Sequence, residues 1–227
     1  LFHSILIFIG LFAMHDAFAS EDNLQPIHTI NFNQPSSLSP LEWFQEQNYV
    51  LGLDAEDFEY HFNNNGLTIS TQSKKAAIFG IPFKNTDKFN DIDYVDIEWG
   101  VKRYPVKANW EKKKREVAIA SMFFFGTKKI SSGLPFGIHS APYFISSFIG
   151  NAEPVNKVYK GKLYKKGGRY INVANSEQKG QLITNRIYLK KRFLEFYDEE
   201  SVPPLSGFAI QMNSKGSKGG AESFIKS

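Results

Sequence analysis

The sequence predicts an all-β protein, folded as a β-sandwich with one or two short helices. Short runs of alternating polar and apolar residues recur along the chain, Gly, Asn and Pro separate them, and the helical patterns are brief. The 227-residue chain has no cysteine, which excludes disulfides, Cys-ligated zinc and cysteine nucleophiles. Stability must therefore come from buried apolar area, which 21 Phe and 10 Tyr supply.

The N-terminal residues show the pattern of a secretory signal peptide. Residues 4–13 are almost entirely apolar, and Ala17-Phe18-Ala19 follows as a cleavage motif of the A-x-A type. The apolar run is about half of the ~20 residues that span a bilayer. We therefore expect a signal peptide over residues 1–19, a periplasmic or secreted bacterial protein, and no stable membrane span after cleavage. The alternative is a buried N-terminal strand or helix.

Residues 20–57 are expected to form an N-terminal extension that belongs to one domain with the sandwich of residues 58–227. Within the extension, His28–Phe32 alternates and predicts an edge strand. A short helix is expected over Leu41–Tyr49, because Ser39 can cap it, Pro40 suits its first position and Glu42 completes a capping box.

The strands of the sandwich follow from alternation and from turn residues. Asn63–Gly66 predicts a turn because Asn and Gly tolerate positive φ. Val95–Val101 alternates cleanly, which is typical of a half-buried antiparallel strand. Val117–Phe125 is apolar on both faces and should lie at the centre of a sheet covered on both sides, ending at Gly126. Leu182–Leu194 indicates helical spacing, with a short helix over residues 192–197. The other expected strands are Phe58–Phe62, Leu67–Thr71, Ala76–Phe83, Tyr143–Ile149, Lys157–Tyr164, Tyr170–Ala174, Phe208–Met212 and Ala221–Ile225.

The order of these elements resembles the DUF3047 family of uncharacterised bacterial proteins with signal peptides. The likeness covers residues 58–227, and the segments that carry it are Ile97-Glu98-Trp99, 116–126, Tyr143-Phe144, 181–186, 207–214 and 221–225. The resemblance implies a jelly-roll sandwich similar to carbohydrate-binding modules and galactose-binding-like domains, and it carries no established activity. Two departures stand out: Phe144 takes the place of an expected Trp, and the 213–218 turn carries Lys215 and Lys218 where acidic residues were expected.

The charge distribution argues against a nucleic-acid partner. The chain has 27 basic and 23 acidic residues, a formal charge of +4, and the two signs are interspersed. The densest basic run, Lys112–Arg115, lies between Glu111 and Glu116 and is interpreted as a solvated strand entrance. A basic patch for anionic lipid or polysaccharide is the alternative.

No catalytic motif, metal site or cofactor site is predicted. The sequence contains no nucleophile elbow, His-Glu-x-x-His or Walker loop. Two carboxylate clusters, within residues 54–59 and 91–98, could serve glycoside hydrolysis, but a solvated strand face explains each of them.

Aromatic platforms are the remaining functional signal, because sugar rings stack their C–H faces on aromatic side chains. Trp99 is expected in the core, since its face otherwise carries Val and Ile. The predicted ligand-binding residues are Trp110, Tyr143, Tyr159 and the loop residue His139. Three hypotheses follow: non-catalytic recognition of a polysaccharide or envelope component, a polysaccharide-acting enzyme that uses His139 with a carboxylate, and an envelope assembly protein.

Overall fold

The computed structural model describes residues 25–33, 37–132 and 140–227. The predicted signal peptide and His139 therefore lie outside the described residues.

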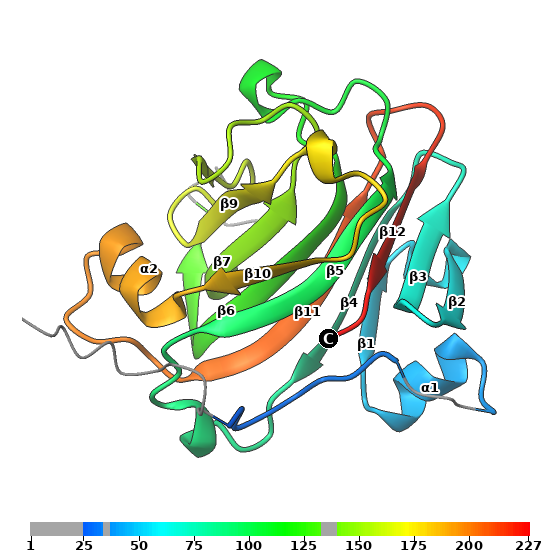
Figure 1. Cartoon of the computed structure of the whole chain (residues 1–227). Coiled ribbons are helices and arrows are strands. Elements are labelled where there is room, and N and C mark those ends of the chain that lie inside the picture. Colours follow the sequence, from blue (N-terminus) through cyan, green and yellow to red (C-terminus); the bar gives the residue numbers. More distant parts are fainter. Residues whose placement is uncertain (1–24, 34–36, 133–139) are drawn as a thin grey trace, which may run out of the picture.

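The described chain forms two stacked β-sheets, with the five-stranded sheet in front of the seven-stranded sheet in Figure 1. Strands are antiparallel except for the parallel pair β7–β9. The seven-stranded sheet has the order β1 (Val50–Leu53), β4 (Ala76–Pro82), β11 (Leu205–Asn213), β6 (Val117–Ser131), β7 (Ser140–Ile149), β9 (Gly168–Ala174) and β8 (Val158–Lys160). The five-stranded sheet has the order β10 (Ile183–Ile187), β5 (Val95–Arg103), β12 (Ala221–Ile225), β3 (Gly66–Thr71) and β2 (Glu59–Asn63).

The chain repeatedly crosses from one sheet to the other, since β3, β5, β10 and β12 lie in one sheet and β4, β6, β9 and β11 in the other. This confirms the predicted all-β class and the jelly-roll sandwich.

Only two α-helices occur among the described residues, α1 (Pro40–Glu46) and α2 (Leu189–Phe196). The capping box of α1 is present: Ser39 Oγ accepts from the Glu42 N–H at 3.4 Å, and Glu42 Oε2 accepts from the Ser39 N–H at 2.8 Å. Short 3₁₀ turns are η2 (Ala55–Asp57), η3 (Asp87–Phe89), η4 (Trp110–Lys112) and η6 (Ser176–Gln178). Neither α-helix has the length and apolar character that crossing a membrane requires.

The main core lies between the two sheets. From β5, Ile97, Trp99 and Val101 point inward and are buried, as their alternation predicted. The facing sheet contributes Phe79 from β4 and Ile210 from β11, among others. Because β6 is central in its sheet and buried on both faces, its continuous apolar sequence is explained.

Three local predictions are corrected by the pairing of strands, and one strand was not predicted. His28–Phe32 is not a strand; Phe32 is buried and its N–H donates to Lys226 O, but no ladder forms. The helical pattern over Leu182–Leu194 divides into β10 and α2, because β10 finds a pairing partner in β5. The strand expected over Lys157–Tyr164 is limited to β8, and β1 was missed because it has only four residues.

Gly126 does not end the central strand. Its φ is +64°, and the register of β6 against β7 shifts after Phe125, so the backbone forms an irregularity there and continues to Ser131. Its N–H donates to Pro204 O instead of to a neighbouring strand.

Candidate functional site

The outer face of the seven-stranded sheet, which points away from the five-stranded sheet, is the candidate site. Strand pairing aligns its outward residues in three rows. The central row is Val50, Gly80, Ala209, Met122, Ser146, Tyr170 and Tyr159. The rows on either side are Gly52, Ile78, Gln211, Ala120, Phe148 and Asn172, and Pro82, Gly207, Phe124, Phe144 and Gly168. None of these register positions carries a charged side chain.

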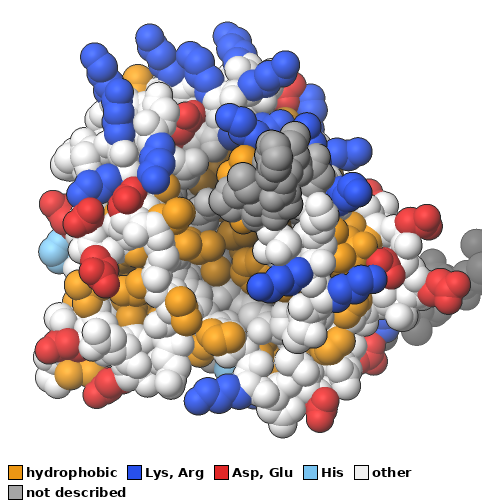
Figure 2. All heavy atoms as spheres, turned by 180° about the vertical axis from the view of Figure 1, so that it is seen from behind, with side chains coloured by type: hydrophobic (Ala, Val, Ile, Leu, Met, Phe, Trp, Pro, Cys, Tyr) orange, Lys and Arg blue, Asp and Glu red, His pale blue; other side chains and the backbone are white. Residues whose placement is uncertain are grey.

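Side-chain size changes across this face. The outward residues of β4 and β11 include the small Gly80, Gly207 and Ala209, and those of β6 and β7 include the large Phe124 and Phe144. Gly80 must be small, because a Cβ there would lie 2.5 Å from Phe208 O. Small residues beside large aromatic ones make the face uneven, and Figure 2 shows it as a hollow lined by hydrophobic side chains.

An aromatic cluster fills one end of the outer face. Trp110 stacks on Phe148 with ring centroids 4.7 Å apart, and its ring also contacts Tyr159 and Tyr170. Its Nε1–H donates to Glu116 O at 3.3 Å. Trp110 is only 6% exposed. The expectation that it forms an exposed platform is therefore corrected: the polar sequence around it is a loop that folds back and buries the ring.

A buried carboxylate holds this loop in place. Glu153 is 2% exposed, and its Oε1 accepts from the Trp110 N–H at 2.7 Å. Its Oε2 accepts from the N–H groups of Asn151 and Ala152 at 2.8 and 3.0 Å. Three backbone donors offset the cost of burying the charge. Glu153 thus joins the β5–β6 and β7–β8 connections and positions Trp110.

The other predicted ligand-binding residues are dispersed. Tyr159 lies on the outer face, and its hydroxyl donates to Glu111. Burial, and then the hydrogen bond to Glu111, raise the pKa of Tyr159. Tyr143 points to the other side of the sheet, where its ring packs on Tyr197 and its hydroxyl donates to Glu199 Oε1 at 2.8 Å. The structure therefore brings Trp110 and Tyr159 together and separates Tyr143 from them.

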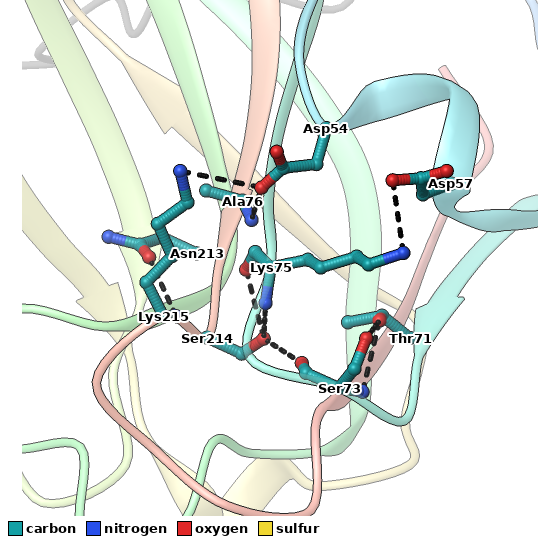
Figure 3. Close-up of polar contacts among 9 residues, drawn as sticks. All are labelled: Asp54, Asp57, Thr71, Ser73, Lys75, Ala76, Asn213, Ser214 and Lys215. Carbon is teal, nitrogen blue, oxygen red and sulfur yellow. Dashed lines mark hydrogen bonds and ion pairs between the residues drawn. The ribbon is translucent and has the colours of Figure 1, made fainter.

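Two acids of the first acidic cluster, Asp54 and Asp57, are paired with lysines (Figure 3). Asp54 Oδ2 accepts from the Ala76 N–H at 3.1 Å and forms an ion pair with Lys215 at 3.4 Å. The backbone N–H of Ala76, and then Lys215, lower the pKa of Asp54. Asp57 pairs with Lys75 at 3.0 Å. The turn between β11 and β12 thus supplies a lysine to Asp54.

The second acidic cluster is also ion-paired. Asp96 binds Arg186 through two hydrogen bonds of 2.9 Å each, and Asp91 binds Lys190 at 2.7 Å. In the part of the chain that the structure describes, no group of three or more His, Asp or Glu side chains could hold a metal ion. Both clusters therefore fit the interpretation that their carboxylates belong to solvated strand faces.

Two loops form a basic surface beside the hollow, and we call residues 104–116 and 150–167 together the basic cap. It contains three Glu and ten Lys or Arg, a net formal charge of +7, although the whole chain carries only +4. Arg115 Nη1 donates to Lys160 O at 2.8 Å, which joins the two loops. From the sequence, Lys112–Arg115 was interpreted as a solvated strand entrance with a basic patch as the alternative, and the second segment that extends the run into a larger basic surface was not recognised. Counting charge by segment would have indicated it.

Comparisons with known proteins leave the function open. No family model matches the chain, and no curated protein sequence matches it. One similar solved chain comes from a structural comparison of two major endo-1,4-beta-xylanases of Trichoderma reesei. It shares 9% identity at a TM-score of 0.30, over 75% of this chain and 92% of that chain. A TM-score this low carries no argument, so the fold rests on the strand pairing and the function on the geometry of the outer face.

Proposed function

We propose that this β-sandwich is a non-catalytic binding protein that recognises a glycan or another component of the cell envelope on its outer face. The observation that supports this most is the hollow in the outer face, where the half-buried side chains are Ile78, Phe124 and Gln211 and the three rows of register positions carry no carboxylate. The expected signal peptide and the resemblance to DUF3047 proteins remain predictions that agree with this proposal.

The composition of the hollow suits the apolar faces of sugar rings. Phe124 is half-buried on the outer face, with its ring centroid 5.7 Å from that of Phe144. Gln211 is half-buried two strands away from Phe144 and offers an amide that can donate and accept. Aromatic surface together with a small number of polar groups is typical of ligand sites.

A glycosidase is the second candidate, and the geometry favours it less. Glycoside hydrolysis needs two carboxylates about 5–9 Å apart across the sugar. The register positions of the outer face supply none, and Asp54, Asp57, Asp91 and Asp96 of the two acidic clusters are each paired with Lys or Arg.

The test is a glycan array that includes bacterial envelope polysaccharides, followed by calorimetric titration of any ligand that is retained. Phe124→Ala and Gln211→Ala should each weaken binding about tenfold, because a central contact commonly contributes more than 1 kcal/mol. The matched control is Tyr188→Ala, an exposed aromatic that follows β10 in the other sheet, and it should bind normally. Retention of no glycan, or equal binding by Phe124→Ala and wild type, would reject the proposal.

A further inference from the structure

The basic cap exposes an unusual density of lysine. All nine of its lysines are exposed to solvent: Lys107, Lys112, Lys113, Lys114, Lys157, Lys160, Lys162, Lys165 and Lys166. Among the described residues only Lys157 of these nine forms an ion pair, with Glu111 at 2.7 Å. In Figure 2, Lys and Arg side chains gather along the upper edge of the hollow face. Figure 1 places the β5–β6 connection at the same end of the molecule.

The acids of the cap do little to neutralise this charge. Glu153 is buried and bound by three backbone N–H groups. Glu111 is engaged by Lys157 and Tyr159. Glu116 is half-buried and lies against Gly216. Eight exposed lysines therefore face solvent without a carboxylate partner among the described residues, and they present a concentrated positive potential.

Exposed aliphatic side chains stand among these lysines. Val106, Val155 and Leu163 are 51%, 44% and 42% exposed. Val106 precedes Lys107, and Leu163 follows Lys162. Exposure of aliphatic side chains to water is unfavourable. A soluble polyanion is attracted by charge alone and would leave these side chains exposed. A lipid bilayer interface accepts aliphatic groups and attracts lysine at once.

We propose that the basic cap docks on the surface of a bilayer that contains anionic phospholipid. The lysines contact the phosphate headgroups, and Val106, Val155 and Leu163 enter the interfacial region. Each lysine near such a surface strengthens partitioning about fivefold, within a screening length of about 8 Å at physiological ionic strength. This inference is independent of the ligand proposed for the outer face, although docking would hold the hollow close to the membrane.

The test is flotation of the full chain with vesicles of phosphatidylcholine alone and of phosphatidylcholine mixed with phosphatidylglycerol. Binding to neutral vesicles measures the apolar contributions, from residues 4–13 and from the aliphatic side chains of the cap, and the difference between the two vesicle types measures the contribution of the lysines. We expect at least about tenfold stronger binding to the anionic vesicles, and this difference should decline as salt is added.

Matched variants identify the surface. Lys162→Glu with Lys165→Glu should reduce the anionic-lipid-dependent binding at least about tenfold. The control pair, Lys84→Glu with Lys191→Glu, places the same charge change on exposed residues outside the cap and should have much less effect. Leu163→Ser should weaken binding about threefold or more, whereas Leu194→Ser, at a site of similar exposure on α2, should not.

Three results would overturn the inference: equal binding to both vesicle types, equal losses in the two lysine pairs, or unchanged binding by Leu163→Ser. The last result would show that the cap binds vesicles by charge alone and would overturn the insertion of its aliphatic side chains. Phe124→Ala should retain vesicle binding, so failure of the glycan proposal and failure of the docking proposal can be told apart.

Discussion

The core between the sheets and the aromatic cluster on the outer face are both built from large buried rings, but they are enclosed differently. Strands of two sheets surround the core, where Trp99 donates its Nε1–H to Asn185 Oδ1 at 2.8 Å. The outer cluster has a sheet on one side, and on its other side the η4 loop lays Trp110 over Phe148. Aromatic rings in this protein are thus buried either between the two sheets or between one sheet and a loop.

This difference predicts that the core and the loop that carries Trp110 respond differently to disruption. A strand that borders the core can detach only if the two sheets separate, so disruption of the core unfolds the whole sandwich. The loop that carries Trp110 is held by Glu153, Arg115 and the ring contacts, and it can open while the ladders remain intact. The comparison teaches that the sandwich, which carries the outer face, unfolds as a whole, whereas the cap beside that face is anchored separately.

The largest expected effect is in the core. Trp99→Ala should lower the free energy of unfolding by about 3–5 kcal/mol, because it leaves a cavity between the sheets and an unpaired Asn185 amide oxygen. Urea denaturation followed by circular dichroism measures this loss. A loss below about 1 kcal/mol would contradict the enclosed position of the ring.

The cap should respond locally. Trp110→Ala is expected to lower the free energy of unfolding by about 2 kcal/mol, less than Trp99→Ala, because the loop can relax around the gap. Hydrogen exchange should increase most in residues 104–116 and 150–160, and in β3 and β12 by no more than the loss of global stability allows. Exchange that increases equally in all strands would show that the cap is not a separate unit.

The smallest effect distinguishes the two faces of a single strand. Ser147 and Ser146 of β7 are both buried; Ser147 Oγ lies 2.6 Å from Ser121 Oγ on the core side, whereas Ser146 Oγ has no hydrogen-bond partner among the described residues. Ser147→Ala should destabilise the protein by about 1–2 kcal/mol, and Ser146→Ala should be neutral or stabilising by about 1 kcal/mol. Thermal unfolding of both variants checks the opposite signs, and equal destabilisation would contradict them.

The sequence-based predictions that were wrong concern residues whose structure depends on contacts with residues far away in the chain. The spacing of Leu182, Arg186 and Leu189 fitted a helix. In the structure, residues 183–187 pair with β5 instead, because strand pairing outweighs the local helical pattern. Trp110 was placed in a polar segment and therefore expected at the surface. Its burial depends on Phe148 and Glu153, which lie about forty residues further along the chain.

The sequence by itself determined the elements whose signals are local. The capping box of α1, the Asn-Gly turn before β3 and the alternation of β5 depend on residues a few positions apart, and each was predicted correctly. Only the tertiary structure decided that the ring of Trp110 is buried, and that two loops with ten basic residues form one cap. The physical reason is that burial and charge density depend on neighbours in space, which the folding of both sheets brings together.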